Sequence, residues 1–133
     1  MWMLDTDTCS YILRRRPGTV ALRFKRANPG TIGISSVVLA ELYYGANLHP
    51  NRAALRKDIR EFASGLALVS WDGEAADHYG DIRAELERIG KPIGAMDMMI
   101  AAHVRSRNEV LVTNNTKHFL RVPRLKVENW MLE

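Results

Sequence analysis

Three carboxylates in this sequence each stand in an otherwise apolar stretch. Asp5 closes the apolar run at the N-terminus, Glu41 is the only Asp, Glu, Lys or Arg within 32–50, and Asp97 is the only one within 93–103. An ionised carboxylate close to a protein core is costly unless a cation pairs with it, and these stretches offer no Lys or Arg. If the fold brings the three together, a divalent metal ion is the simplest partner.

Asn115, which follows the apolar run 110–113, completes the candidate set with the three carboxylates. Mg²⁺ and Mn²⁺ prefer oxygen ligands, usually one or two carboxylates together with waters and substrate phosphate. An ion held in this way makes its bound water more acidic and neutralises charge on a phosphodiester. A spare carboxylate nearby can take the proton of that water. The sequence therefore predicts a phosphodiester-cleaving site of Asp5, Glu41, Asp97 and Asn115.

Each of these residues also has a purely structural explanation. Asp5 could begin an Asx turn, and Asn115 could be an ordinary turn residue. Glu41 could pair with a distant cation such as Arg83. Asp97 could be a first-turn charge that the helix macrodipole favours. These explanations stay open at the level of sequence.

Short apolar runs alternate with helical patterns along the chain. Strands are expected at 2–5, 31–35, 66–69, 110–113 and 127–129. Helices are expected between them, at about 8–16, 20–28, 36–47, 52–62, 72–89 and 95–106, and Asp7 or Thr8 is the expected N-cap of the first. This alternation predicts an α/β fold with a mainly parallel sheet, whose ligands bind beyond the carboxyl ends of the strands.

Composition narrows the class of protein. At 133 residues, with 47% hydrophobic and 26% charged residues, the chain is expected to form a single domain over 1–133. The lone Cys9 excludes an internal disulfide framework, and no segment is long and apolar enough to span a membrane, so a cytoplasmic protein is expected. The histidines show no metal-ligand spacing with one another.

The net charge of +4 is concentrated at the two ends of the chain. Residues 1–30 carry a balance of +4, residues 31–90 of −3, and residues 91–133 of +3. Such a distribution suits a surface that grips phosphates, although solvated helix faces explain it equally well. The candidates for contacts to a nucleic-acid backbone are Arg14, Arg15, Arg16, Lys25, Arg26, Lys117 and Arg121.

Asp5-Thr6-Asp7 after an apolar strand resembles the opening of haloacid-dehalogenase-type phosphatases, in which the first Asp is a nucleophile. That family has Thr or Val where this chain has Cys9. It also has a late pair of Asp residues, whereas Asp97 is the only Asp after Asp81. The match is therefore poor.

Four segments carry a closer resemblance to a different family. They are Met3-Leu4-Asp5-Thr6, Ile34–Val37 leading into Glu41–Ala46, Pro92–His103 and Val112–Phe119. In this order, and over essentially the whole chain, they resemble PIN-domain ribonucleases, and among these the VapC toxins of bacterial toxin–antitoxin pairs. The full chain is most similar to the enterobacterial branch of those toxins.

This resemblance implies a Rossmann-like α/β/α sandwich that binds Mg²⁺ or Mn²⁺ and cleaves RNA. Asp5, Glu41 and Asp97 match the family's acidic triad, and Asn115 matches a fourth position that is Asp or Asn among members. We expect Asp5 and Asp97 to hold the metal ion, with Asn115 as a direct or water-mediated ligand. Glu41 is expected to bind through water or to act as the base. Asp7 is better explained as a helix cap than as a metal ligand.

The resemblance also implies partners. Members of this branch cut initiator tRNA in the anticodon loop, form homodimers and are held inactive by a cognate VapB-type antitoxin. Two alternatives remain: a non-catalytic RNA-binding module of the same fold, and a regulatory protein that only docks its antitoxin. Cleavage requires the metal ion, whereas simple binding survives chelation better, so metal dependence separates the enzyme from the binding module.

Overall fold

Five parallel strands form the central sheet of the structure, a computed structural model that describes residues 1–131. The strands are β1 (Trp2–Leu4), β2 (Ile32–Ser35), β3 (Ala67–Val69), β4 (Val110–Val112) and β5 (Lys126–Glu128). They lie in the order β3-β2-β1-β4-β5, and every neighbouring pair is parallel. The predicted α/β fold is confirmed. The order reverses at β1, so the switch point of the sheet lies between β1 and β4.

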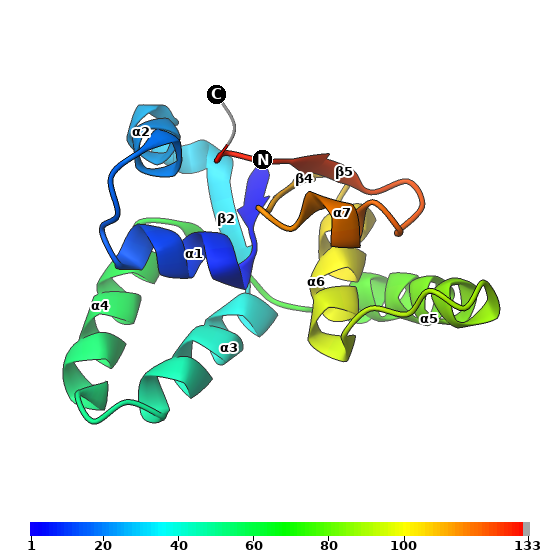
Figure 1. The fold of residues 1–133 in the computed structure, drawn as a ribbon, viewed down its shortest axis with the longest axis horizontal. Helices are drawn as coiled ribbons and strands as arrows, with labels where there is room; N and C mark the ends of the chain where they lie inside the picture. The colour runs from blue at the N-terminus through cyan, green and yellow to red at the C-terminus, as the bar shows by residue number, and fades with distance from the viewer. Residues whose placement is uncertain (132–133) are drawn as a thin grey trace.

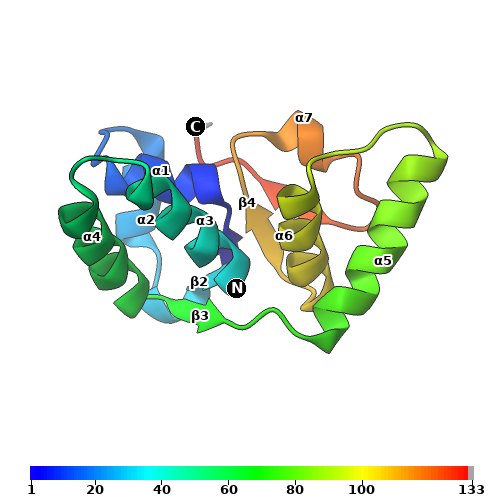
Figure 2. The ribbon, with the colours of Figure 1, turned by 90° about the horizontal axis from the view of Figure 1, so that it is seen from below.

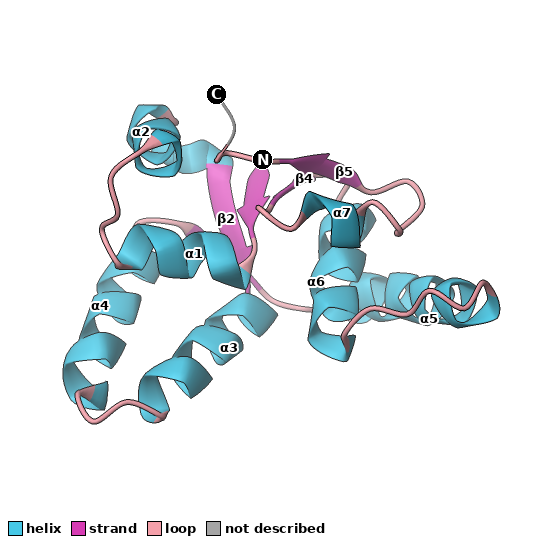
Figure 3. Ribbon diagram, in the orientation of Figure 1, coloured by secondary structure: helices cyan, strands magenta, loops and turns pink. Residues whose placement is uncertain are grey.

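Helices flank the sheet and make the molecule an α/β sandwich (Figures 1 and 3). The helical segments are α1 (Thr6–Leu13), α2 (Thr19–Arg26), the 3₁₀ turn η1 (Pro29–Thr31), α3 (Ser36–Asn47), α4 (Arg52–Ser64), α5 (Gly73–Arg88), α6 (Ala95–Ser106) and α7 (Thr116–Phe119). Figures 1 and 2 show α1 to α4 gathered on one side of the molecule and α5 to α7 on the other. Across residues 1–131, no helix is long and apolar enough to cross a membrane.

The three central strands are buried, which explains their continuous apolar sequences. Met3, Leu4, Ile34, Leu111 and Val112 are each at most 1% exposed. Strands covered on both faces read as apolar runs rather than as an alternation of apolar and polar residues. In each strand, the first polar side chain available to a ligand is therefore the one that follows the apolar run.

The structure differs from the sequence-based prediction at two helices. The N-cap of α1 is Asp5, whose Oδ1 accepts the backbone N–H of Thr8 at 2.8 Å, whereas Asp7 lies exposed in the first turn. An Asp at the end of a strand can satisfy a first-turn N–H as soon as the chain turns into a helix, so the helix begins earlier than predicted. The second difference is α7, a single turn that the sequence did not indicate.

Arg105 of α6 is a buried cation that ties three parts of the chain together. Its guanidinium donates to His78 Nδ1 at 2.8 Å, to Asp81 Oδ2 at 2.6 Å and to the carbonyl of Pro123 at 3.2 Å. The paired arginine holds the pKa of the Asp81 carboxyl below its usual range. This clamp fixes α6 against α5 and against the segment that leads to β5. It thereby fixes the helix that carries Asp97.

His103 of α6 is 1% exposed, and its Nδ1 lies 2.8 Å from Ser35 Oγ. Burial, assisted by the charge of Arg107, lowers the pKa of its imidazole. The unfolded chain, with an ordinary histidine pKa of about 6.5, then binds more protons than the folded one in the window just below that value. We expect this contribution to stability to be complete above about pH 6.5 and to fall as the pH drops through that window.

Urea unfolding of the wild type and of His103→Gln at about pH 7.5 and about pH 5.5 measures this effect. The variant is expected to lose less stability between the two pH values than the wild type does. His49→Gln, which alters an exposed histidine, should keep the wild-type difference. An equal loss in wild type and His103→Gln would show that another group causes the acid sensitivity.

Candidate active site

Asp5 is the most deeply placed of the candidate residues. It directly follows β1, is 4% exposed, and donates its backbone N–H to the Val112 carbonyl at 3.0 Å. Burial raises the pKa of its carboxyl, while hydrogen bonds from Thr113 and Thr8 oppose that rise. The structural explanation of Asp5 as a local turn residue is therefore partly correct, because its side chain caps α1. It does not remove the cost of keeping a charged carboxylate in a buried position.

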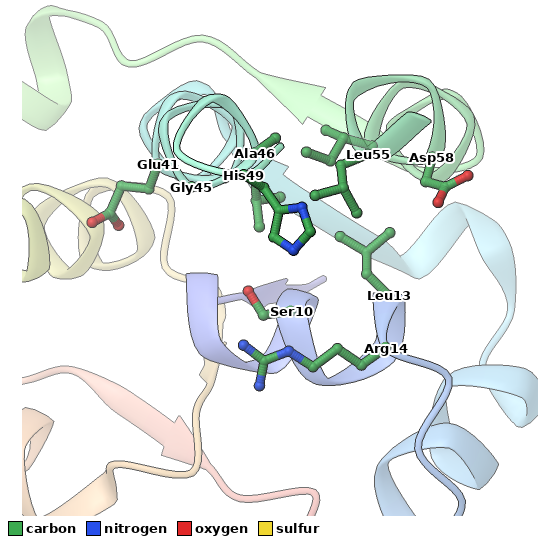
Figure 4. Close-up of a pocket in the computed structure, with 11 residues that line it drawn as sticks. Ser10, Leu13, Arg14, Glu41, Gly45, Ala46, His49, Leu55 and Asp58 are labelled. Carbon is green, nitrogen blue, oxygen red and sulfur yellow. The ribbon is translucent and has the colours of Figure 1, made fainter. Parts of the chain in front are cut away.

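Glu41 is connected to Asp5 through the next residue in the chain. Thr6 donates its hydroxyl to Glu41 Oε1 at 2.6 Å, which joins the start of α1 to the middle of α3. The suggested pairing with Arg83 is wrong, since Arg83 binds Glu87 within α5 at 2.9 Å. In Figure 4 the Glu41 carboxylate projects from α3 toward the pale-yellow α6, one of the helices against which α3 packs.

Asp97 lies in the first turn of α6, and its partner comes from α7. His118 Nε2 lies 3.0 Å from Asp97 Oδ2, and both side chains are partly exposed. The N-cap residue of α6, Gly94, offers no side chain, so a negative charge at Asp97 also complements the orphan N–H groups of that helix end. The carboxylate therefore has local support and still faces solvent.

Asn115 is exposed and occupies the N-cap position of α7 without a capping hydrogen bond from its side chain. Its backbone N–H donates to Thr113 Oγ1 at 3.0 Å. The same Thr113 forms a hydrogen bond with the Asp5 side chain, which lowers the pKa of that carboxyl. The fold thus fixes the backbone of Asn115 and leaves its amide free of any role in capping.

The topology brings Asp5 and the segment that leads to Asn115 out of the sheet at one edge, and hydrogen bonds connect Glu41 and Asp97 to these two segments. Leu4 of β1 is paired with Val112 of β4, so the residues that follow them, Asp5 and Thr113, leave the sheet at the same level. This level lies at the carboxyl ends of the strands that border the switch point, where open α/β sheets bind ligands. Glu41 reaches this edge through Thr6, and Asp97 is tied by His118 to the helix that follows Asn115.

The donor set suits a hard divalent cation, because it consists of carboxylate and amide oxygens. Within residues 1–131, no three Asp, Glu, His or Cys side chains form a ready-made metal cluster. A set of two carboxylates, one amide, waters and a substrate phosphate does not require such a cluster. Among the described residues, moreover, no ion pair neutralises Asp5 or Glu41, so a cation at this edge would relieve both.

Three supporting residues escaped sequence reasoning: Thr6, Thr113 and His118. His118 stands isolated in the sequence, because it has no metal-ligand spacing to the other histidines. The sequence feature that could have linked His118 to the site is its spacing of three residues from Asn115. A residue three positions after an N-cap lies on the first turn of the helix, so His118 and Asn115 are held together once α7 is recognised.

A groove runs from Glu41 between α1, α3 and α4, with a volume of about 490 Å³ (Figure 4). Its walls combine apolar side chains, such as Leu13 and Leu55, with the carboxylates of Glu41 and Asp58. Leu42 also lines the groove, but it is only 6% exposed and belongs mainly to the core. The groove therefore offers apolar walls with two carboxylates and the guanidinium of Arg14 at its sides.

Comparison with known proteins places this chain and its fold in a family. The family model described as "PIN domain" matches residues 2–125. The tRNA(fMet)-specific endonuclease VapC of Shigella flexneri is 44% identical over 129 residues, which is 97% of each chain. One chain of the crystal structure of DNA-bound VapBC from Salmonella typhimurium superposes with a TM-score of 0.92 at 41% identity, over 97% of each chain.

A second solved complex agrees with the first. A chain in the structure of VapBC2 from Rickettsia felis, bound to a DNA fragment of its promoter, has a TM-score of 0.89 and 37% identity, covering 97% of this chain and 98% of that one. Sequence identity and fold both extend over nearly the full length. The chain therefore belongs to the PIN-domain family, and within it to the VapC ribonucleases.

Proposed function

We propose that this protein is a Mg²⁺- or Mn²⁺-dependent endoribonuclease toxin that cuts tRNA in the cytoplasm and is neutralised by a VapB-type antitoxin. The observation that carries the proposal is the buried Asp5 carboxylate at the switch point of the sheet, joined through Thr6 to Glu41. A buried carboxylate with a raised pKa and without a cationic side chain costs stability, which is typical of functional sites.

The residues have distinct proposed roles. Asp5 and Asp97 would hold the metal ion, with the Asn115 amide as a direct or water-mediated ligand. When bound, the ion supplies a more acidic water and neutralises charge on the scissile phosphate. Glu41 is the candidate base, because Thr6 fixes its Oε1 while Oε2 accepts no hydrogen bond within residues 1–131. Attack by water on phosphorus leaves a 5′-phosphate and a 3′-hydroxyl.

The substrate proposal follows the relatives. The Shigella flexneri protein, at 44% identity, is named for cleavage of tRNA(fMet), and so is a Salmonella typhimurium protein at 43% identity. We propose initiator tRNA, cut in the anticodon loop, as the substrate of this chain. Loss of initiator tRNA would block translation at its first step.

The proposed partners are a cognate antitoxin and a second copy of the chain. Solved relatives are VapBC complexes, which supports an antitoxin for this protein. The groove beside Glu41 is the proposed seat of an antitoxin segment, since its apolar walls suit a short helix. Its two carboxylates suit a basic side chain of that segment, while Arg14 is the only Lys or Arg in the lining. The homodimer is proposed on family resemblance alone.

Incubation of antitoxin-free protein with bulk tRNA tests this function. We expect discrete fragments with Mg²⁺ or Mn²⁺, none with EDTA, and none from Asp97→Asn. Addition of the cognate antitoxin should suppress the fragments. Tight binding of tRNA without any cleavage, from protein shown to be folded, would favour the non-catalytic RNA-binding module instead.

His118→Ala is expected to weaken Mn²⁺ binding by about 10- to 100-fold, because partners that orient a metal-ligating carboxylate have effects of that size. Isothermal titration of Mn²⁺ into the protein without RNA measures this directly. His49→Ala, which removes an exposed histidine in the groove beside Glu41, is the matched control and should bind Mn²⁺ as the wild type does. Unchanged Mn²⁺ affinity in His118→Ala would mean that His118 does not position Asp97 for the ion.

A further inference from the structure

A second groove, with a volume of about 780 Å³, lies between α7 and the segment that joins α5 to α6. The side chains used below are Ile89, Lys91 and Pro92 on one wall and Lys117, Leu120 and Arg121 on the other. We call this surface the α7 groove. Arg121 Nη1 donates to the Pro92 carbonyl at 3.2 Å, so the two walls are tied together.

The charge of the α7 groove is entirely positive. Its lining contains three cations and no acidic side chain. Within residues 1–131, none of the three takes part in an ion pair, whereas Arg83 and Arg88 of the neighbouring α5 pair with Glu87 and Glu85. Like charges that converge without a counter-charge repel one another, and a bound polyanion would relieve that repulsion. Lys91 is far from Lys117 and Arg121 in the sequence, and the fold brings the three cations to one groove.

Between these cations the groove presents aliphatic surface. Ile89 is 44% exposed and Leu120 is 69% exposed, and Pro92 lies beside them. A lining that combines cations with apolar side chains suits a chain that carries both phosphates and apolar faces of sugars and bases. Contacts from Lys and Arg to phosphate oxygens carry no sequence information, so binding through these cations would not depend strongly on base identity.

Both walls of the α7 groove lead directly into the candidate active site. Thr116, which lines the groove, follows Asn115 in the chain, and His118 on the same helical turn contacts Asp97. On the other wall, Pro92 is followed within two residues by Gly94, the N-cap of α6. A polyanion lying in the groove would therefore continue toward the carboxylates.

We infer that the α7 groove holds the sugar–phosphate backbone of the RNA on one side of the bond that is cut, and that it supplies affinity without base selection. This inference rests on the proposed function and adds a place for one strand of its substrate. Base selection then has to come from other surfaces of the protein.

The test compares two triple variants in the Asp97→Asn background, which prevents cleavage during binding. One is Lys91→Gln, Lys117→Gln, Arg121→Gln, and the matched control is Arg52→Gln, Lys57→Gln, Arg60→Gln on the exposed face of α4. Each removes three positive charges, and α4 lies on the opposite side of the molecule from α7 (Figure 1). Anisotropy of labelled initiator tRNA gives the affinity over a range of salt concentrations, and thermal melting verifies the fold of both variants.

Three lost backbone contacts should lower the slope of log affinity against log salt by about 2, at roughly 0.7 per contact to single-stranded RNA. The α4 control should keep the wild-type slope. An unchanged slope in the groove variant, or an equal loss in both variants, would overturn the inference, and so would a loss confined to antitoxin binding. Cleavage by the protein with Asp97 intact is measured separately. RNA binding that depends on the groove cations, without any cleavage, would therefore count against the proposed function. Cleavage by the protein together with a salt slope that does not depend on the groove cations would count against the inference.

Discussion

Asp5→Asn is expected to lower the rate of RNA cleavage by about 1,000-fold or more while leaving the protein at least as stable as the wild type. Asn removes the charge that the metal ion requires. Asn is as good an N-cap as Asp, so α1 should keep its first turn. Because burial raises the pKa of the Asp5 carboxyl, the ionised side chain costs stability near neutral pH, and the neutral amide does not. Single-turnover cleavage and thermal melting measure the two effects.

Asp7→Asn is the matched control, since it makes the same chemical change two residues away at an exposed position. It should cleave RNA at close to the wild-type rate. Equal activity of the two variants would remove Asp5 from the site. A marked fall in the melting temperature of Asp5→Asn would show that the carboxylate serves the fold rather than the chemistry.

Phe119→Ala is expected to cost about 3–5 kcal/mol of folding free energy. Phe119 is 1% exposed and lies in a helix of only four residues, which cannot be stable without packing. Loss of this anchor should release α7, and with it His118 and Asn115, so cleavage should fall even at temperatures where the protein stays folded. Chemical denaturation and cleavage at low temperature measure the two consequences.

Leu120→Ala is the control for stability. Leu120 directly follows Phe119 in the chain, but its side chain is 69% exposed. It should change the free energy of unfolding by no more than about 0.5 kcal/mol. Phe119→Leu should recover part of the loss, since it refills most of the cavity. If Phe119→Ala and Leu120→Ala had the same stability, burial of Phe119 would not be what holds α7 in place.

Much of the architecture was predictable from the sequence, because buried parallel strands and amphipathic helices leave strong patterns. The apolar runs at β1, β2 and β4 gave their positions to within a residue or two, and the alternation with helices gave the parallel sheet. The isolated charges at Asp5, Glu41 and Asp97 identified the candidate site for a physical reason: a carboxylate without a cation nearby in the sequence needs an explanation.

What the sequence did not reveal depends on contacts between distant segments. The hydrogen bonds of Thr6 to Glu41 and of His118 to Asp97 join residues 35 and 21 positions apart. No local pattern predicts such pairs. The N-cap of α1 was misplaced for a different reason, since Asp5 serves the strand end, the helix start and the candidate site at once. The four-residue α7 is too short to show a helical period.

Cleavage of initiator tRNA in water enriched in ¹⁸O, followed by mass spectrometry of the fragment ends, tests the central claim most directly. Attack by a water molecule in a metal-dependent site predicts a 3′-hydroxyl on one fragment and a 5′-phosphate carrying one heavy oxygen on the other, with both products lost in EDTA and in Asp97→Asn. A 2′,3′-cyclic phosphate without heavy oxygen would contradict the account, because it requires attack by the 2′-hydroxyl of the RNA itself.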